Sequence, residues 1–279
     1  MARQLETGTD DLLARVEGGV GVITLHRPKR RNALSTAMYG GFDTVLPRFL
    51  ADDEVRVVMV TGTGTAFCAG GDVKQMDENN QSAAESGGGG GLSVEETVAE
   101  LRLRQRSVSL TLHRFPKPVV AALPGPAAGA GLSIALSADL RIAAERAILV
   151  TAFTSIGASG DFGGSWFLTR LVGQAKAKEL YFWSPRLPAS EAERLGIVNK
   201  VLPDEDFEQH ALDYCAELAA RAPIGLRYAK ENINRALDVD LASALDAEAL
   251  AMRLSMSTDD HAEAAAAFVE KRPPVFHGR

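Results

Sequence analysis

Cysteine is scarce in this sequence. Cys68 and Cys215 are the only two among 279 residues, and they lie far apart along the chain. A chain of this length buries a substantial core without covalent cross-links, and two cysteines can form only one bridge. The sequence therefore predicts a reduced, cytoplasmic protein rather than a secreted one held together by disulfides.

An excess of basic residues is also lacking. The 36 acidic residues outnumber the 30 lysines and arginines, and the formal net charge is −6. Partners such as nucleic acid or an anionic membrane surface are therefore disfavoured. The five histidines do not show the spacing of metal ligands, so we expect no metal site.

The sequence has no convincing membrane or signal segment. Residues 1–19 mix acidic and basic side chains with few apolar ones, unlike the apolar part of a signal peptide. Residues 118–138 carry no charge over a length that would suffice for a membrane span. Prolines and glycines interrupt this run, which predicts a short buried strand, a turn and a helix of small residues.

Apolar patterns typical of strands and helices alternate along the chain. The expected strands cover residues 12–16, 20–25, 55–61, 119–123, 140–143, 147–151 and 197–202. The expected helices cover residues 32–50, 94–115, 165–182, 190–196, 204–221, 224–237, 241–257 and 259–271. Ser190 and Glu193 have the spacing of a capping box. Between these elements, residues 77–93 contain five consecutive glycines and are expected to form a mobile loop, either a solvated insertion or a lid.

This order of elements predicts two regions. Strands and helices alternate over residues 1–200, which indicates an α/β core, and residues 201–279 are almost entirely helical. We therefore expect one core domain with an appended helical layer.

Two glycine-containing loops follow two of the buried strands, at residues 67–72 and 125–131. Small residues let a ligand approach the backbone closely. Two free N–H groups from such loops can point at one oxygen and form an oxyanion hole. A dinucleotide-binding loop is disfavoured, because Gly129 and Gly131 lack the third glycine of that fingerprint.

Six motifs in one order resemble the enoyl-CoA hydratase/isomerase (crotonase) superfamily, over roughly residues 12 to 275. These motifs are Arg27–Leu34, Phe67–Lys74, Gly125–Asp139, Gly163–Ser165, Ala192–Val198 and Phe268–Arg272. The resemblance implies a spiral of ββα units and a helical C-terminal region that builds trimers, usually paired into hexamers. It also implies an acyl-CoA thioester as substrate and no separate cofactor, since coenzyme A is part of the substrate.

The resemblance also implies roles for individual residues. The backbone N–H groups of Ala69 and Ala130 match the family's oxyanion hole. The substrate and its CoA would be bound by Lys29, Ala66, Cys68, Gly70, Gly71, Asp72, Val73, Lys74, Gly129, Phe153, Trp166, Phe268 and Lys271. Phe153 and Trp166 would line the acyl pocket, and Phe268 and Lys271 match positions that often reach the CoA of a neighbouring subunit. Cys68 has no paired base in the sequence, so packing is its alternative role.

Departures from the family pattern bear on the reaction. Hydratases of the family use two glutamates, and the matching positions here are Ser133 and Phe153. Phenylalanine cannot move a proton, and serine without a base is a poor acid–base catalyst. Ser133 is a weak catalytic candidate, with a secondary polar contact or simple helix filling as alternatives.

Asp161 matches the position where other members of the family place a catalytic aspartate. Burial would raise the pKa of its carboxyl group, and the helix expected near residue 165 would lower it by less. The structural alternative is that Asp161 only caps that helix.

We therefore expect an acyl-CoA isomerase in which Asp161 moves a proton across an enolate. The alternatives are an enoyl-CoA hydratase, an enzyme that uses Asp161 as a nucleophile in hydrolysis or dehalogenation, and an acyl-CoA-binding oligomer without catalysis.

Overall fold

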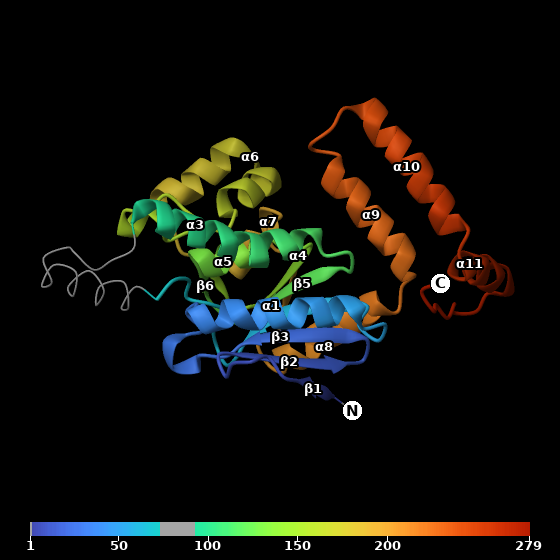
Figure 1. The fold of residues 1–279 in the computed structure, drawn as a ribbon, viewed down its shortest axis with the longest axis horizontal. Helices are drawn as coiled ribbons and strands as arrows, with labels where there is room; N and C mark the ends of the chain where they lie inside the picture. Colours follow the sequence, from blue (N-terminus) through green and yellow to red (C-terminus); the bar gives the residue numbers. More distant parts are fainter. Residues whose placement is uncertain (1, 73–92) are drawn as a thin grey trace, which may run out of the picture.

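A computed structural model describes residues 2–72 and 93–279 (Figure 1). Val73, Lys74 and residues 77–92 of the expected loop lie outside the described residues. No helix in the described parts of the chain is long and apolar enough to cross a membrane.

The core is a seven-stranded sheet with the strand order β1-β2-β3-β4-β5-β7-β10. Its strands are β1 (Arg3–Leu5), β2 (Leu12–Glu17), β3 (Val20–Leu25), β4 (Val57–Gly62), β5 (Val119–Leu123), β7 (Leu140–Ala144) and β10 (Lys200–Leu202). The first three strands pair in antiparallel fashion, and all pairs from β3 to β10 are parallel. The two expected strands at residues 12–16 and 20–25 pair as an antiparallel hairpin, β2–β3, whereas the edge strand β1 was not expected.

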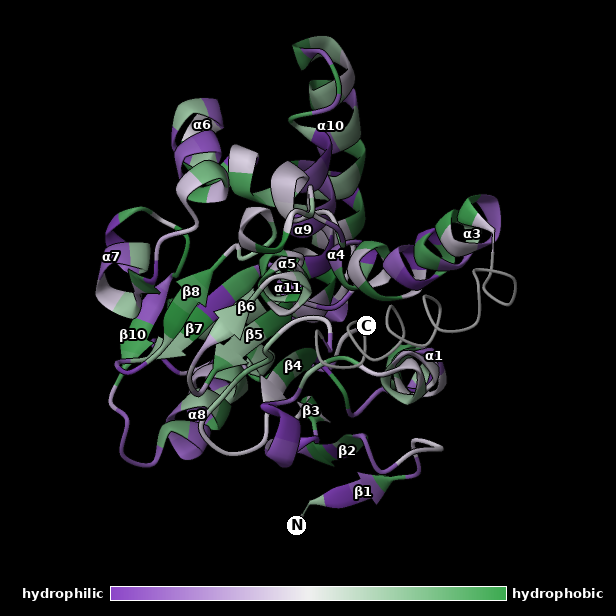
Figure 2. Cartoon of the chain, turned by 90° about the vertical axis from the view of Figure 1, so that its left-hand side faces the viewer, coloured by the Kyte–Doolittle hydropathy of each residue, from purple (hydrophilic) through white to green (hydrophobic). Residues whose placement is uncertain are grey.

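Burial on both faces explains why the central strands are almost continuously apolar. Every residue of β4 and β5 is buried, and Figure 2 shows β4 in green and the edge strand β1 largely in purple. Helix α8 (Phe207–Ala219) covers one face through Phe207, Ala211 and Cys215. The opposite face carries helix α1 (Thr36–Ala51) and the core cluster that includes Cys68. Both cysteines are buried and free, in different clusters, as a reduced protein requires.

A second, three-stranded sheet lies beyond the first. It consists of β6 (Ala127–Ala128), β8 (Ile148–Val150) and β9 (Leu187–Pro188). Two successive parts of the chain have the same order of elements, β5–β6–α5 and then β7–β8–α6. In each part a strand of the large sheet is followed by a strand of the small sheet and then by a helix. Helix α5 covers Ala130–Leu136, and helix α6 covers Gly164–Trp183. This repetition agrees with the expected α/β fold of ββα units.

Three differences from the predicted helices have clear physical causes. Helix α1 begins at Thr36 rather than near residue 32, because the Ser35 side chain caps it and Asn32 has a left-handed backbone with φ of 56°. Helix α7 (Ala189–Arg194) has no capping box: Pro188 is its N-cap residue, and Glu193 accepts a hydrogen bond from the Val201 N–H at 2.9 Å instead. Glu193 thereby ties α7 to strand β10.

The helical segment expected over residues 94–115 consists of three pieces. They are α3 (Val94–Gln105), a π-helical turn (Arg106–Leu110) and α4 (Thr111–Arg114). The apolar positions at helical spacing in residues 94–115 predict one buried helix face, but no residue of α3 is buried and Val94 is 75% exposed. Only the later positions, among them Val108 and Leu112, reach the core.

The C-terminal region divides differently from the expected boundary at residue 200. Helix α8 packs on the sheet, so the projecting arm consists of α9 (Pro223–Arg235), α10 (Leu241–Met256) and α11 (Asp259–Glu270) (Figure 1). Lys230 of α9 anchors this arm to the core, because its ammonium group lies 2.7 Å from the Asp139 carboxylate just after α5. Short 3₁₀ turns at Pro28–Arg30 and Thr154–Ile156 complete the fold.

Candidate active site

The two glycine-containing loops meet by direct backbone contact. Cys68 and Ala127 form a β-bridge, and the Ala128 N–H donates to the Cys68 carbonyl oxygen at 2.9 Å. A Cβ atom on Gly131 would lie 2.6 Å from the Cys68 Cβ and 2.7 Å from its carbonyl oxygen. Glycine is therefore required at 131 for the loops to come this close.

The available N–H groups at this junction differ from the expected pair. The Ala69 N–H donates to the Arg31 carbonyl at 3.0 Å, so the expectation of Ala69 as a free oxyanion donor is wrong. The Gly70 N–H faces the Cys68 sulfur at 3.4 Å. In the described part of the chain, the Gly71 N–H has no hydrogen-bond partner. The Ala130 N–H begins helix α5, where no carbonyl of the preceding turn can accept from it.

Close packing brings these two donors to the same place. A Cβ atom on Gly70 would lie 2.7 Å from the Ala128 carbonyl oxygen and 3.4 Å from the Ala130 nitrogen. Gly70 has a φ of 89°, which an L residue rarely adopts. Gly71 follows directly, so its N–H and that of Ala130 are the two donors that the geometry offers for an anionic oxygen.

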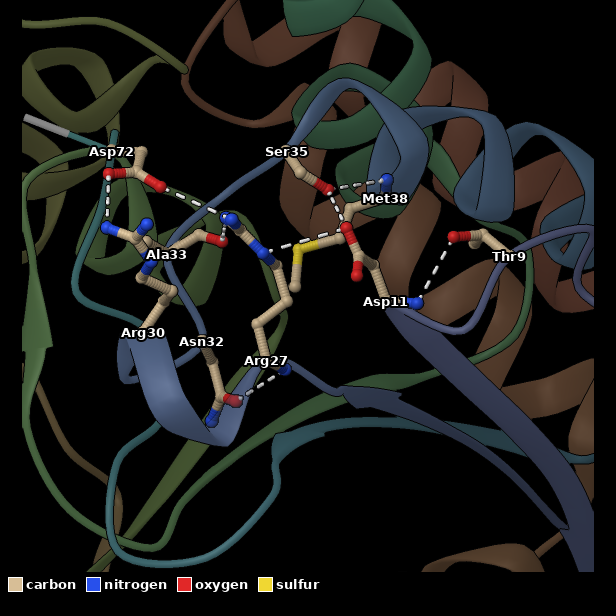
Figure 3. Close-up of polar contacts among 9 residues, drawn as sticks. All are labelled: Thr9, Asp11, Arg27, Arg30, Asn32, Ala33, Ser35, Met38 and Asp72. Atoms are coloured by element: carbon tan, nitrogen blue, oxygen red, sulfur yellow. Dashed lines mark hydrogen bonds and ion pairs between the residues drawn. The ribbon is translucent and has the colours of Figure 1, made fainter. Parts of the chain in front are cut away.

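Arg27 holds the first loop in place (Figure 3). Its guanidinium group donates to the Ala33 carbonyl at 2.7 Å and to the Asp72 carboxylate at 3.3 Å. It also lies 3.6 Å from Asp11. Asp72, expected among the CoA-binding residues, is thus an ion-pair partner of Arg27 and, at 3.9 Å, of Arg30.

Asn32 also holds the first loop in place. Its side-chain amide donates to the carbonyls of Thr63 and Ala66, at 3.0 and 2.8 Å, and its oxygen accepts from the Arg27 N–H at 3.0 Å. Asn32 is fully buried. Arg27 and Asn32 were not named as functional residues from the sequence, although both belong to the motif Arg27–Leu34 and carry its buried polar groups.

Asp161 lies in the loop before α6 with one carboxylate oxygen, Oδ1, buried and without a hydrogen-bond partner in the described parts of the chain. Burial raises the pKa of this carboxyl group to about 6. The helix-capping alternative is wrong, since Gly163 is the N-cap residue of α6 and no side chain caps this helix. A partnerless, desolvated carboxyl group is the property expected of an acid–base residue.

Two tyrosines that sequence analysis missed flank Asp161. Tyr39 of α1 stacks on Phe162 with ring centroids 5.8 Å apart, and Tyr181 of α6 stacks on Phe153 at 6.1 Å. Burial raises the pKa of each phenol to about 12, and the negative charge of Asp161 contributes to both shifts. These tyrosines are therefore neutral at physiological pH. Their positions carry an ordinary helical pattern, so the sequence held no signal for them.

Ser133 and Phe153 both lie close to this group. The Ser133 hydroxyl is buried and donates to the Gly129 carbonyl at 3.3 Å. Phe153 is buried too, and its ring would lie 3.8 Å from a Cβ atom on Gly129. The structure thus brings both residues, as expected, next to the second loop.

The remaining expected site residues occupy other places. Trp166 packs with His113, Phe167 and Arg170, its ring 3.5 Å from the Arg170 guanidinium carbon, beside a cavity of about 400 Å³ between α6 and α9. Lys29 is exposed near the first loop, and Ala66 is buried just before that loop begins. Phe268, 85% exposed, and Lys271 lie at the end of α11 in the projecting arm (Figure 1).

Burial raises the pKa of the Cys68 thiol to about 12, in agreement with a packing role.

Comparison with known proteins identifies relatives along nearly the whole chain. Residues 15–279 match the family described as enoyl-CoA hydratase/isomerase. The chain is 35% identical to the 1,2-epoxyphenylacetyl-CoA isomerase of Escherichia coli, over 96% of this chain and 98% of that protein. It is 34% identical to the short-chain-enoyl-CoA hydratase of Clostridium acetobutylicum, over 94% and 96%. The crystal structure of an enoyl-CoA hydratase from Polaromonas sp. JS666 superimposes with a TM-score of 0.86 at 34% identity, covering 95% of this chain and 99% of that one.

We predict that Gly131→Ala destabilises the protein by about 1–3 kcal/mol, because the added methyl group overlaps the Cys68 backbone and side chain. Gly40→Ala is the matched control: Gly40 lies inside helix α1 with nothing within 4 Å of the added atom. That control should stabilise by about 0.5–1 kcal/mol. Urea denaturation measures both, and equal stability of the two variants would contradict the close approach of the loops.

Proposed function

Because this chain belongs to the enoyl-CoA hydratase/isomerase family, we propose that it shifts a carbon–carbon double bond in an acyl-CoA substrate, with Asp161 as the acid–base residue. The main support for this proposal is that one carboxylate oxygen of Asp161 is buried and has no hydrogen-bond partner in the described chain. A carboxyl group whose pKa lies near 6 can act both as a base and as an acid near neutral pH, whereas one with an ordinary pKa stays ionised there.

The proposed reaction uses the two donors at the loop junction. The N–H groups of Gly71 and Ala130 hydrogen-bond the thioester oxygen as negative charge develops on it, in place of the originally expected pair of Ala69 and Ala130. Donors of this kind lower the barrier because the protein has already oriented them.

Asp161 carries the proton between two carbons of the acyl chain. Its carboxylate takes a proton from the carbon next to the thioester carbonyl, and the electron pair of that C–H bond enters the enolate. The resulting carboxylic acid then returns the proton to the far end of the allylic system, which moves the double bond. No cofactor is needed for these steps, since the proton and the electrons stay within substrate and enzyme.

Hydration is the second candidate, because one of the relatives named above is a hydratase. The local chemistry favours it less. Phe153 carries no acid–base group, and the Ser133 hydroxyl is buried against the Gly129 carbonyl. Among the described residues near this junction, the Asp72 carboxylate is ion-paired with Arg27 and Arg30, which leaves Asp161 as the acid–base candidate. Activating a water and protonating a carbon are tasks that two carboxyl groups share in the two-glutamate mechanism. Nucleophilic attack by Asp161 and binding without catalysis remain as outcomes of the tests below.

For the CoA portion we propose a path along the first loop. It would run past Lys29, Ala66, Cys68, Gly70, Gly71, Asp72, Val73, Lys74 and Gly129. Arg27 and Arg30 already pair with Asp72, so the proposed role of Asp72 is to hold these cations beside the ligand rather than to contact the anionic phosphates. The cytoplasmic location stays a prediction from the sequence.

We also propose that the arm α9–α11 joins copies of the chain into a trimer or a dimer of trimers. Large apolar side chains project from it into solvent, among them Leu241 at 75% and Val269 at 80% exposure. Phe268 and Lys271 lie on the same arm, away from the loops of their own chain, and in such an assembly they would reach a neighbour's CoA.

Replacing Asp161 by asparagine should abolish the proton transfer. We expect Asp161→Asn to lower kcat for a 3-enoyl-CoA by about 10²–10⁴-fold, with the exposed Asp43→Asn of helix α1 as a control of unchanged activity. Incubation with a 3-enoyl-CoA and, separately, a 2-enoyl-CoA distinguishes the reactions by a shifted double bond, hydrated product and free CoA. An Asp161→Asn variant as fast as the parent, or a parent that only hydrates or only hydrolyses, would refute the isomerase proposal.

The reaction should also depend on pH through Asp161. The base must be the carboxylate, and burial raises its pKa to about 6. We therefore expect kcat/KM to be constant above pH 7 and to fall about tenfold per pH unit below pH 6. Steady-state kinetics at constant ionic strength measures this profile. A rate that does not change between pH 4.5 and pH 7 would contradict the assignment of Asp161.

Light scattering tests the assembly. Burying the apolar side chains of the arm should give a particle of three or six copies of the 29.7 kDa chain. Leu241→Asp with Leu245→Asp on α10 should reduce this mass, because both positions are exposed in the single chain and would be covered in the assembly. A monomeric parent at micromolar concentration would rule the proposal out.

A further inference from the structure

The hydroxyl group of Tyr181 lies close to the backbone on both sides of Asp161: a Cβ atom on Gly160 would be 3.5 Å from it, and a Cβ atom on Gly164 only 2.6 Å. The same atom on Gly164 would be 2.3 Å from the Ser133 hydroxyl oxygen. Glycine at 164 therefore makes room for the Tyr181 hydroxyl, and a Cβ atom on Gly160 would lie 3.1 Å from the Tyr181 ring carbon Cε1. Residues 160–164 are called the Asp161 loop below.

Further contacts tie Tyr181 to the elements around the site. Its ring stacks on Phe153 with an angle of 11° between the ring planes. Its carbonyl accepts a hydrogen bond from the Thr154 hydroxyl at 2.7 Å. Its hydroxyl interacts with the Ser133 side chain of α5, the helix that begins with Ala130. Tyr181 thus joins α6, α5, residues 153–154 and the Asp161 loop.

Among the described residues, few charged and titratable groups act on Asp161 and Tyr181. Asp161 raises the pKa of Tyr181 and of Tyr39, which approaches from α1. Cys68, Arg104 and Glu100 act on Tyr39 in turn. Arg104 lies over the Tyr39 ring at 5.0 Å from its centre, and the first loop contributes the neutral Cys68 thiol. Asp161 therefore faces neutral hydroxyl and aromatic groups, and Tyr181, 9% exposed, is one of the walls that keep water away.

We propose that Tyr181 is a positioning residue for Asp161: its ring shields the carboxyl group from water, and its hydroxyl group holds the Asp161 loop against Ser133. This proposal deepens the proposed function, on which it rests, by assigning the residue that keeps the transferred proton from exchanging with solvent. A carboxylic acid that is shielded from solvent returns to the substrate the proton that it took. A solvent-exposed one exchanges that proton with bulk water first.

Two substitutions separate the ring from the hydroxyl group. Tyr181→Phe keeps the ring and its stacking on Phe153, and Tyr181→Leu removes both the aromatic wall and the hydroxyl. Tyr214→Phe is the matched control: Tyr214 is also a partly buried tyrosine, but it lies on α8, where its ring faces Lys200. The substrate is a 3-enoyl-CoA that carries deuterium on the carbon next to the carbonyl, and the reaction runs in ordinary water.

We expect the parent and Tyr214→Phe to keep a substantial share of the deuterium at the new position. Tyr181→Phe should lower kcat by about tenfold with KM changed less than twofold, and it should keep most of the label, because one hydrogen bond is lost and the shield remains. Tyr181→Leu should lower kcat by about a hundredfold and lose the label. Equal kcat and equal label retention in the parent and both Tyr181 variants would overturn the proposal.

A double-mutant cycle tests the Ser133 contact in variants that keep the ring. Ser133→Ala and Tyr181→Phe each remove one partner of the same contact, so their effects on kcat should not add. Additive effects would overturn the part assigned to the hydroxyl group, even if Tyr181→Leu does not fold.

A titration of Asp161 by carbon NMR is independent of turnover. Burial raises the pKa of Asp161 to about 6 in the parent, and water admitted by Tyr181→Leu should move it down toward the ordinary value. If the parent does not isomerise but this shift occurs, the shielding by Tyr181 stands and the proposed function fails. An unchanged Asp161 pKa in a folded Tyr181→Leu variant overturns the shielding.

Discussion

The close approach of two backbone segments is the constraint on which the rest of the candidate site depends. Gly131 lies so near Cys68 that a single methyl group would overlap its side chain and its carbonyl oxygen, and Gly70 has the same relation to the Ala128 carbonyl. Side chains cannot fill this junction, so its polar groups are those of the backbone. Most of them are paired between the loops or with Arg31, which leaves the N–H groups of Gly71 and Ala130 without a partner among the described residues.

A second constraint is electrostatic and acts on the other side of the site. Within residues 2–72 and 93–279, Asp161 lies among aromatic rings and neutral hydroxyl groups rather than beside a cation, in contrast to Asp72, which two arginines approach. The two carboxyl groups therefore have different surroundings. Ion pairs with Arg27 and Arg30 make Asp72 part of the scaffold, whereas desolvation raises the pKa of Asp161 to about 6.

Much of the fold followed from local pattern. The buried strands β4 and β5 were predictable because burial on both faces demands apolar residues at every position. Helix α3 was predicted as a helix, but its apolar face is not buried, because valines at helical spacing indicate a buried face only where another element covers it. The capping box of α7 failed for a related reason: Glu193 has the right spacing, but strand β10 offers it a different donor.

The candidate site, like the fold, was only partly predictable from the sequence. The sequence determined by itself which residue types were present at the loops: glycines that allow close approach, one aspartate where no glutamates stand, and the motifs that mark the family. Only the tertiary structure decided that Ala69 is already hydrogen-bonded, that Trp166 packs toward α9, and that Tyr39 and Tyr181 flank Asp161. Hydrogen-bond partners and desolvation depend on what lies next to a group in space, and those neighbours come from segments that are distant in the chain.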